Sequence, residues 1–418
     1  MGAGNDIALL SAAAFTSPVW GYHLLTTGKW RTDWAARFGR CAPVTRTAPR
    51  SILIHAVSVG ETNAIRTLVE AIHRETSWQV ICSSTTDTGI VRARSLFEPQ
   101  HRVVRYPIDL TRSVNRFLDA VQPDLVALVE LEVWPNFIAA CHRRSIPICV
   151  VNGRLSDVSF SRYRLLRPLV RSMFGGLDAV GAQTRTYADR FEAMGVPRKC
   201  VQVLDTMKWD TAQIADQVDG AAALATAMGI DRSRPLIVAG STAPGEEKLL
   251  AETCPPEAQL LIAPRKPEWF DAAAAVAPGI VRRTRHPDGT TRPCDGTRIF
   301  LLDTIGELRK AYALADVAMV GRSFLGLYGS DMIEPIALGK PTIIGTHHQN
   351  FADAVEALVA GRGLEVTADP GRVAAQLLAD PARANALAAR GRDVIRARQG
   401  STARHLDMLR ATMPTSPA

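Results

Sequence analysis

An apolar strand pattern that passes directly into a helical pattern, at residues 52–66, places the strongest constraint on the fold of this chain. Residues 52–57 are apolar and rich in β-branched side chains, which predicts a buried strand of a parallel sheet. A short turn follows, and Glu61 begins a segment with apolar residues at helical spacing. Open α/β sheets place their chemistry where a strand ends and a helix begins. Glu61 is therefore a candidate proton acceptor, because the helix dipole there favours an ionised carboxylate; the alternative is that Glu61 only caps its helix.

The same alternation continues along the chain and predicts two domains. In the first half, strands are predicted at residues 52–57, 79–82, 125–129, 147–151 and 179–182, with helices such as 111–121 and 135–144 between them. After a linker-like segment at 211–229, strands are predicted at residues 236–239, 260–263, 299–302, 317–320 and 341–344. We therefore expect an α/β fold with two Rossmann-like domains facing a central cleft, and 418 residues are enough for both cores. The expected division is a segment at 1–40, an N-terminal domain at 41–210 and a C-terminal domain at 211–418.

The N-terminal segment has the composition of a membrane-associated helix. Residues 7–26 are almost free of charge and approach the ~20 residues that a spanning helix needs. Tryptophans and basic residues follow at once, as interface anchors do, among them Lys29, Arg31, Arg37 and Arg40. The positive-inside rule then predicts that the rest of the chain lies in the cytoplasm. The alternative is a helix that packs on the protein's own body.

Charge is unevenly distributed. The formal net charge of +8 lies within residues 1–213, whereas the remaining residues are balanced. This asymmetry favours an anionic partner for the N-terminal half, either a membrane surface or nucleic acid. The sequence contains no nucleic-acid recognition motif, so an anionic membrane surface is the predicted partner and nucleic acid is not. A solvated basic surface without a partner is the alternative.

Common cofactor and metal motifs are absent from the sequence. The seven cysteines are scattered singly, which argues against zinc and against a disulfide framework and fits a reducing cytosol. The dinucleotide fingerprint, the P-loop, the His-Glu-x-x-His motif and paired Asp-x-Asp carboxylates are also missing. We therefore predict neither a metal ion nor a cofactor.

Two acids, Glu130 and Glu132, follow the apolar strand predicted at 125–129. Carboxylates are costly to place at the end of a buried strand unless they are functional or paired. Both are therefore candidate functional residues. The alternative is a paired structural acid, and it applies more strongly to Glu132.

In the second half, four polar groups follow predicted strands. Residues 240–247 combine small residues, hydroxyls and backbone N–H groups, the composition of an anion site at a helix start. Pro264 and Arg265 end the next strand, residues 303–308 repeat the arrangement, and Glu334 can accept hydrogen bonds from ribose hydroxyls. Each group has a structural alternative. Four of them at the strand ends of one domain favour a phosphorylated nucleotide as ligand.

From Arg37 to about residue 365 the chain resembles the Kdo transferases, the family that transfers Kdo (3-deoxy-D-manno-octulosonic acid) from CMP-Kdo to lipid A. The resemblance implies the GT-B architecture, inversion at the anomeric carbon, and no metal or cofactor. It also implies CMP-Kdo and lipid A as partners, and a place in lipopolysaccharide synthesis at the inner membrane. The motifs that carry it are His55 to Glu61, Glu130 to Asn136, Asn152 to Ser156, Gly240 to Thr242, Pro264 with Arg265, Asp303 to Leu308, His347, and Asn350 with Phe351.

The resemblance also implies roles for individual residues. Glu61 matches the proton acceptor of the family, and Glu130 and Lys208 match its transition-state stabilisers. The residues expected to contact the substrate or its nucleotide are Ser241, Thr242, Pro264, Arg265, Ile305, Gly306, Glu307, Asp331, Met332, Ile333, Glu334 and Asn350.

The chain departs from the family pattern at residues 328–334, where an acid, Asp331, replaces the usual Asn, and at Asp87, which replaces a Pro. A carboxylate beside a nucleotide phosphate costs binding energy unless it is neutralised. We therefore predict an ion pair between Asp331 and Arg322. The departure leaves two alternatives open: a GT-B transferase for another CMP- or nucleotide-activated sugar, and an inactive lipid- or sugar-binding relative. The presence of Glu61, Glu130, Lys208 and Arg265 argues against the inactive form, because binding alone needs no general base.

Overall fold

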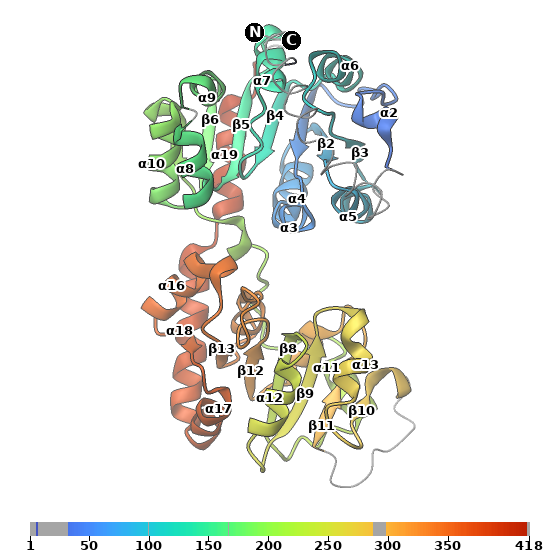
Figure 1. The fold of residues 1–418 in the computed structure, drawn as a ribbon, viewed down its shortest axis with the longest axis vertical. Helices are drawn as coiled ribbons and strands as arrows, with labels where there is room; N and C mark the ends of the chain where they lie inside the picture. Colours follow the sequence, from blue (N-terminus) through green and yellow to red (C-terminus); the bar gives the residue numbers. More distant parts are fainter. Residues whose placement is uncertain (1–5, 7–31, 99, 166, 287–297, 416–418) are drawn as a thin grey trace. The chain divides into compact units, whose positions relative to one another are not determined.

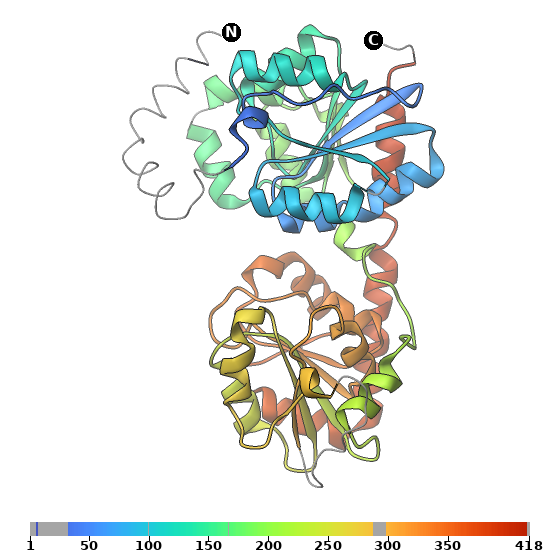
Figure 2. The same ribbon diagram turned by 90° about the vertical axis from the view of Figure 1, so that its right-hand side faces the viewer.

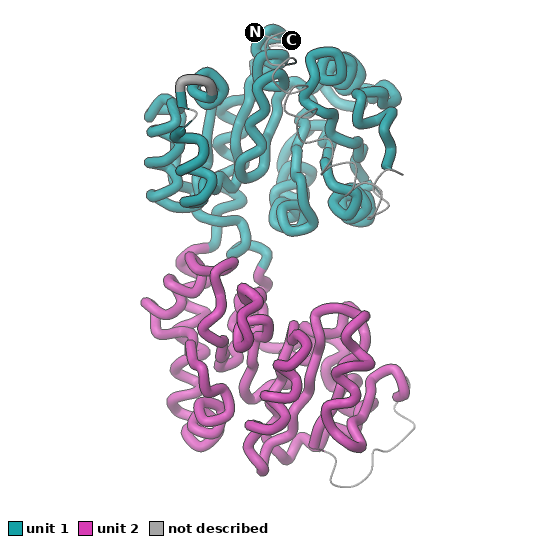
Figure 3. Tube along the Cα trace, in the orientation of Figure 1, with its two compact units in different colours: residues 1–211, 399–418 teal, residues 212–398 magenta. Residues whose placement is uncertain are grey.

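The computed structural model describes residues 6, 32–98, 100–165, 167–286 and 298–415, and the chain forms two compact units (Figure 3). Unit 1 comprises residues 1–211 and 399–418, and unit 2 comprises residues 212–398. The helix predicted at 7–26 lies outside the described residues. Across the part of the chain that the structure describes, no helix has the length and apolar character needed to cross a membrane.

Unit 1 is built on a seven-stranded parallel sheet in the order β3-β2-β1-β4-β5-β6-β7 (Figure 1). The central strands are buried on both faces, so they are apolar throughout rather than alternating; all five residues of β4 are buried. Strands predicted at 125–129 and 179–182 are confirmed to the residue, whereas the short β3 and β7 were not predicted. The strands are β1 (Arg50–His55), β2 (Trp78–Ser84), β3 (Arg102–Arg105), β4 (Leu125–Val129), β5 (Ile148–Gly153), β6 (Ala179–Ala182) and β7 (Val201–Val203).

Helices cover both faces of this sheet, which makes unit 1 a doubly wound domain. One face is covered by α4 (Arg66–Glu75), α5 (Asp87–Phe97) and α19 (Ser401–Thr412). The other is covered by α6 (Thr111–Val121), α7 (Pro135–Arg143), α9 (Arg167–Phe174) and α10 (Arg185–Met194). Shorter elements are α2 (Trp34–Arg37), α3 (Val59–Ala64), α8 (Asp157–Leu165) and the 3-10 turns η2 (Arg198–Cys200) and η3 (Met207–Trp209).

Unit 2 repeats the plan with a second seven-stranded parallel sheet, in the order β10-β11-β9-β8-β12-β13-β14. The strands are β8 (Leu236–Thr242), β9 (Gln259–Pro264), β10 (Val281–Arg282), β11 (Ile299–Leu301), β12 (Val317–Val320), β13 (Thr342–Ile344) and β14 (Glu365–Val366). The helices and 3-10 turns are α11 (Ala221–Met228), α12 (Glu246–Thr253), η4 (Pro267–Trp269), α13 (Phe270–Ala274), η5 (Arg283–Arg285), α14 (Leu308–Leu314), α15 (Ile333–Ala337), η6 (Gln349–Phe351), α16 (Ala352–Ala360), α17 (Pro370–Ala379) and α18 (Pro381–Arg398). Both sheets reverse their strand order at the centre, between β1 and β4 and between β8 and β12. Rossmann-like sheets bind their ligands at such reversals.

The last helix does not belong to the C-terminal domain in which it was expected, at 211–418. α18 ends in unit 2, and α19 packs on α4, β5 and β6 of unit 1. In both ribbon views the red C-terminal helix lies against unit 1 (Figures 1 and 2). Its Leu406, Met408 and Leu409 belong to the apolar core there. The compact second unit therefore ends at residue 398.

Candidate functional site

Glu61 lies on the first turn of α3, at the carboxyl end of β1 and at the reversal of the strand order. Ser58 caps this helix: its Oγ accepts the Glu61 N–H at 3.3 Å and donates to Glu61 Oε1 at 2.8 Å. The other carboxylate oxygen, Oε2, accepts the Val57 N–H at 2.8 Å. Ser58 and Glu61 stand at the two positions of a capping box, but the carboxylate accepts the N–H of Val57, the residue before the cap, instead of that of Ser58. The capping role that the sequence left open is therefore present, and it holds the carboxylate in one place.

Burial raises the pKa of Glu61 to about 7, against the hydrogen bonds from Val57 and Ser58, and the carboxylates of Glu130 and Glu132 raise it further. This differs from the expectation of a carboxylate kept ionised by the helix dipole, because near neutral pH both protonation states are populated. A pKa close to the working pH suits a general base.

Glu130 follows β4, the strand next to β1, and has a φ of 59°, in the left-handed region. Such a conformation costs a non-glycine residue about 1–3 kcal/mol and persists where the surroundings hold it. The segment after β5 holds it here: the Glu130 N–H donates to Val151 O at 3.0 Å, and Glu130 O accepts the Arg154 N–H at 3.3 Å. Strain at a strand end beside Glu61 makes Glu130 a candidate functional residue.

Glu132 is a partnered acid. Its Oε2 accepts the Trp134 Nε1–H at 2.9 Å. Burial raises the pKa of Glu132 against this bond, and Glu130 raises it as well. Glu132 therefore fits the structural alternative more closely than Glu130 does, although its charge contributes to the environment of Glu61.

Lys208 lies in η3, and Asn152 connects this turn to the end of β5. The Met207 N–H donates to Asn152 Oδ1 at 3.2 Å, and Thr206 Oγ1 accepts the Lys208 N–H at 3.4 Å. Asn152 itself has a φ of 53° and is fully buried. Residues 151–154 therefore contact the turn that carries Glu130 on one side and the turn that carries Lys208 on the other.

The C-terminal helix α19 forms hydrogen bonds with the end of β5 and with the residue that follows η3. His405 is buried, and its Nε2 accepts the Asn152 N–H at 3.0 Å, so the ring proton is on Nδ1 and donates to Ser401 O at 2.8 Å. Burial lowers the pKa of His405, in agreement with a neutral ring. Asp210, which follows η3, caps α19 by accepting the Gly400 N–H at 2.7 Å and the Thr402 N–H.

His55, in the same motif as Glu61, is a structural residue. Its ring stacks on Tyr106 at a centroid distance of 3.6 Å, and its Nδ1 lies 3.0 Å from Ser83 Oγ. Complete burial lowers the pKa of His55 to about 3, so the imidazole is neutral and takes no part in proton transfer near pH 7.

In unit 2, β8 ends in Ser241 and Thr242, both buried, and Ser241 has a φ of 56°. The turn lies against the end of β12, where a Cβ at Gly321 would come within 2.5 Å of Thr242 Cα. Two buried acids then begin α12. Glu247 accepts a hydrogen bond from Thr242 Oγ1 at 2.9 Å, and burial raises the pKa of Glu247.

Glu246, which the motif contains but the sequence did not single out, is the other acid at this helix start. It is fully buried and accepts three backbone N–H groups, those of Ala243 at 3.1 Å, Arg322 at 2.6 Å and Phe324 at 2.9 Å. Bonds of this kind to a carboxylate are strong, so Glu246 fixes the loop after β12 to the loop after β8. The anion site predicted at 240–247 therefore already contains two carboxylates at the helix start itself.

The residues expected to contact the nucleotide differ in how exposed they are and in the hydrogen bonds that they already form. Arg265 follows β9 and is exposed, and its backbone N–H donates to Thr242 O at 3.0 Å. Ile305 is 70% exposed, an unusual state for an isoleucine, and Gly306 beside it has a φ of 93°. Glu307 accepts bonds from Thr304 Oγ1 at 2.7 Å and Arg283 Nε at 3.1 Å, and although burial opposes them, these bonds hold its pKa below the usual value. Pro264 is the last residue of buried β9.

The predicted ion pair between Arg322 and Asp331 is wrong: among the described residues no such pair is formed. Arg322 and Tyr328 have φ values of 58° and 65°, and the Gly329 N–H donates to Arg322 O at 2.7 Å, which closes a tight backbone turn. Asp331 instead lies at the start of α15, where its Oδ1 accepts the Ile333 N–H at 2.9 Å. The short acid competes successfully for a local backbone partner, as Asp does at helix starts.

Around α15, the side chains of Met332 and Ile333 are buried in the core, so these two candidates present only their backbone. Burial raises the pKa of Glu334, against Arg309, whose Nη1 lies 3.7 Å from Glu334 Oε1. Asn350 is exposed, and its N–H donates to Tyr328 O at 3.1 Å. The sequence therefore placed Met332, Ile333 and Glu334 on one turn but could not tell side chains that face solvent from those that face the core.

The departure at Asp87 has a structural explanation. Asp87 accepts the Thr32 hydroxyl at 2.8 Å and forms ion pairs with Arg105 at 2.8 Å and Arg37 at 3.4 Å. The pKa of Asp87 is lowered because these bonds outweigh its partial burial. Arg37, one of the predicted membrane anchors, is thus held within unit 1.

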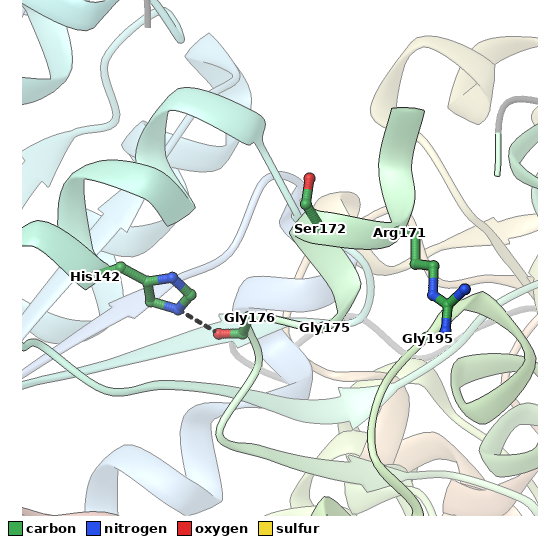
Figure 4. Close-up of a pocket in the computed structure, with 6 residues that line it drawn as sticks. All are labelled: His142, Arg171, Ser172, Gly175, Gly176 and Gly195. Atoms are coloured by element: carbon green, nitrogen blue, oxygen red, sulfur yellow. Dashed lines mark hydrogen bonds between the residues drawn. The ribbon is translucent and has the colours of Figure 1, made fainter. Parts of the chain in front are cut away.

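A surface depression between α7 and α9 contains none of the predicted site residues (Figure 4). It is lined by His142, Arg171, Ser172 and three glycines, and His142 Nε2 lies 2.7 Å from Gly176 O. Both helices end there, so it lies at the edge of the sheet opposite Glu61. Within the described ranges, no three His, Cys, Asp or Glu side chains gather as a metal-binding group.

Comparison with known proteins gives consistent matches. The family profile described as 3-Deoxy-D-manno-octulosonic-acid transferase (kdotransferase) matches residues 32–211. The chain is 36% identical over 406 residues to the 3-deoxy-D-manno-octulosonic acid transferase of Bordetella pertussis, which covers 91% of this chain and 92% of the relative. It is 30% identical over 397 residues to the enzyme of the same name from Haemophilus influenzae, with the same shares covered.

Among solved structures, the chain is similar to HepE of Anabaena in complex with UDP, with a TM-score of 0.58 and 12% identity over 87% of this chain and 100% of that one. It is also similar to MurG of Acinetobacter baumannii, with a TM-score of 0.53 and 14% identity over 88% and 99% of the two chains. At these identities the likeness concerns the fold, two Rossmann-like domains of the GT-B type.

Proposed function

The chain belongs to the family of 3-deoxy-D-manno-octulosonic acid (Kdo) transferases, and from this premise we propose that it transfers Kdo from CMP-Kdo to lipid A with Glu61 as the general base. The observation that carries the assignment of the base is the position of Glu61, a carboxylate with a pKa raised to about 7 at the central reversal of the sheet. Glu61 takes the proton of an acceptor hydroxyl, and the oxygen attacks the anomeric carbon of Kdo. The bond to the CMP phosphate breaks, so the configuration is inverted and CMP leaves with the bonding electron pair.

Glu130 and Lys208 complete the proposed machinery in unit 1. Both are held by residues 151–154, Glu130 through its backbone and Lys208 through the neighbouring Met207 N–H. A fixed anion and a fixed cation stabilise a charge that develops in the transition state without reorganisation of solvent. Glu130 also raises the pKa of Glu61, so it favours proton uptake by the base.

Unit 2 is the proposed binding site for CMP-Kdo. The exposed guanidinium of Arg265 meets the phosphate, Ile305 and Gly306 offer an apolar side chain and an open backbone to the base, and Glu334 accepts hydrogen bonds from the ribose. Because Glu246 and Glu247 already occupy the start of α12, Arg265 and the turn at Ser241 and Thr242 have the larger share in phosphate binding. Met332 and Ile333 contribute backbone groups only, and Asp331 and Glu307 act by shaping their turns.

An acceptor embedded in a membrane requires the enzyme at the membrane surface. The concentration of the whole net charge in residues 1–213 supports an anionic leaflet as the partner of unit 1, and residues 1–40 supply the apolar and basic segment next to it. The corresponding location is the cytoplasmic side of the inner membrane. Arg31 and Arg40 remain proposed contacts, whereas Arg37 is engaged by Asp87.

The proposal is tested by a donor screen with the purified chain and a lipid A precursor. CMP-Kdo is expected to yield a Kdo-modified lipid, detected by mass spectrometry, while CMP-sialic acid and UDP-sugars yield none. Product with another activated sugar and not with CMP-Kdo would establish the diverged transferase, which the altered turn at 328–334 favours as the second candidate. Binding of lipid or sugar without turnover of any donor would establish the inactive relative.

A further inference from the structure

Tyr312 carries a buried hydroxyl at the carboxyl end of the sheet in unit 2. It lies in α14, which packs on β8 and on α15, and only 1% of the residue is exposed. A Cβ at Gly240 would overlap the phenol oxygen, so the hydroxyl lies directly against the end of β8. The next residue of that strand, Ser241, belongs to the turn proposed to bind the phosphate of the donor.

The hydroxyl of Tyr312 has no hydrogen-bond partner among the described residues. A buried hydroxyl in this state destabilises the fold, because the hydrogen bonds that it forms with water in the unfolded chain are not replaced. A phenylalanine would fill the same space without this cost. The packing of the ligand-free unit therefore accounts for the ring of Tyr312 but not for its oxygen, which indicates a partner in another state of the protein.

Charged residues of the proposed nucleotide site act on this hydroxyl. Burial raises the pKa of Tyr312, and the carboxylates of Glu334 and Asp331 raise it further. The guanidinium of Arg265 lowers it. Glu334 and Asp331 belong to the first turn of α15 and the residues before it, whereas Arg265 follows β9. The phenol oxygen therefore lies near three of the segments that are proposed to contact the nucleotide.

Glu334 is the neighbour that can accept a hydrogen bond from the phenol. Arg265 carries only donors, and Asp331 Oδ1 already accepts the Ile333 N–H at 2.9 Å. Glu334 forms an ion pair with Arg309 at 3.7 Å, and a carboxylate has sites for several hydrogen bonds at once. Burial raises the pKa of Glu334, so a further donor to its charged form would help to keep it ionised as an acceptor.

We propose that Tyr312 is a positioning residue for the ribose of the donor: in the nucleotide-bound protein its hydroxyl donates to the Glu334 carboxylate, which in turn accepts hydrogen bonds from the ribose hydroxyls. The inference rests on the proposed function, because it assigns a further residue to the CMP site of unit 2. It requires a change of side-chain conformation at Glu334, of the kind that is common on binding. The hydroxyl left without a partner in the free protein is then satisfied in the complex, which favours the bound state.

The test compares two ligands, CMP and 2′,3′-dideoxy-CMP, which lacks both ribose hydroxyls, by calorimetric titration of the full chain. In Tyr312→Phe the Kd of CMP is expected to rise about tenfold or more, because a hydrogen bond to a charged acceptor is lost. The Kd of the dideoxy nucleotide is expected to equal that of the wild type. The unfolding temperature of the ligand-free variant is expected to rise by about 2–4 °C, because a buried hydroxyl without a partner is removed.

Two further variants separate this role from a structural one. Tyr106→Phe is the matched control, because Tyr106 of unit 1 is also a buried tyrosine whose hydroxyl lacks a partner among the described residues. It is expected to leave the Kd of both nucleotides unchanged. In a Glu334→Gln background, Tyr312→Phe is expected to cause no further loss of CMP affinity, since the two residues act through one contact.

Failure of this inference is distinguishable from failure of the proposed function. If the wild type binds CMP and Tyr312→Phe binds it equally well, or loses the same factor for both nucleotides, the hydroxyl does not act through the ribose and the inference is overturned. A lower unfolding temperature of Tyr312→Phe also overturns it, because the hydroxyl is then already bonded in the free protein. If the wild type itself does not bind CMP, the proposed nucleotide site is overturned together with the inference.

Discussion

At the residue scale, Glu61 combines a capping role with a proposed catalytic one, and a substitution can separate them. In Glu61→Gln the amide oxygen still accepts the Val57 N–H, so the fold is expected to persist, but the side chain no longer takes a proton. We expect kcat with CMP-Kdo to fall by about 100-fold or more, because a positioned base contributes a factor of this order. Initial rates and thermal unfolding of the same preparation measure both effects.

The matched control is Glu70→Gln on α4, an exposed glutamate that forms an ion pair with Arg66 at 2.9 Å. It is expected to retain wild-type turnover. Retention of wild-type turnover by Glu61→Gln as well would show that another group removes the proton.

The pH dependence of the reaction follows from the same carboxyl group. Because Glu61 acts in its deprotonated form and its pKa is raised to about 7, kcat/KM is expected to rise as pH increases through about 7 and then to level off. Ser58→Ala removes a hydrogen bond that favours the charged carboxylate, so the pKa rises and the ascending limb moves to higher pH. Ser95→Ala, on the exposed side of α5, is expected to leave the limb in place. If the limb does not move in Ser58→Ala, the pKa observed in the pH–rate profile belongs to a group other than Glu61.

The position of Glu61 was predictable from sequence and the environment of Asp331 was not, for a physical reason. A strand, a turn and a helix start are local patterns, and they place a residue at the edge of a sheet whatever the remainder does. The ion pair expected between Arg322 and Asp331 depended instead on backbone angles of an irregular turn and on competition with a helix N–H. The pKa of Glu61 likewise depended on burial and on the charges of Glu130 and Glu132, which belong to a segment distant in sequence.

At the scale of elements, the end of β5 is a brace: it forms hydrogen bonds both with the turn that carries Glu130 and with the turn that carries Lys208. Asn152→Gly keeps the left-handed backbone, which glycine adopts freely, and removes the buried side chain together with its acceptor for the Met207 N–H. We expect kcat to fall roughly tenfold, with little change in KM for the donor, because Lys208 is less well positioned. Steady-state kinetics with CMP-Kdo measure this split.

A double variant shows whether the effect passes through Lys208. If it does, Asn152→Gly costs little further rate in a Lys208→Ala background, since coupled residues are not additive. Gln122→Gly is the control, because Gln122 is also left-handed, with a φ of 47°, but lies at the end of α6. Full additivity of Asn152→Gly and Lys208→Ala would assign Asn152 to stability alone.

The sequence predicted the elements of this brace better than their contacts. The strand at 147–151 and the match at residues 152–156 were identified, but the support from His405 was not, because it comes from a helix about 250 positions later in the chain. Glu246 is a similar case. Its helix-start motif suggested an anion site, but in the structure its own carboxylate accepts hydrogen bonds from three backbone N–H groups of two loops.

At the scale of the whole molecule, two sheets of similar plan were predictable because each alternates strands and helices, but the return of the chain to unit 1 was not. An amphipathic pattern identifies a helix and its apolar side without identifying the sheet that this side covers. α19 closes one face of unit 1, and its first turn is capped by Asp210 close to Lys208. Residues 399–418 are therefore part of the unit that carries the proposed base, and not of the unit proposed to bind the nucleotide.

Deleting residues 399–418 is consequently expected to damage unit 1 and spare unit 2. The deletion removes Leu406, Met408 and Leu409 from the core, at about 1.5–3 kcal/mol for each buried side chain, a sum comparable to the whole stability of a domain. It also leaves Asn152 N–H and Asp210 without their partners. Limited proteolysis is expected to cut throughout residues 32–211, while calorimetric titration still detects CMP binding. A chain ending at Thr415 keeps α19 and serves as the control. Resistance of residues 32–211 to protease in the shortened chain, or loss of CMP binding together with it, would show that the two units do not have the separate cores described here.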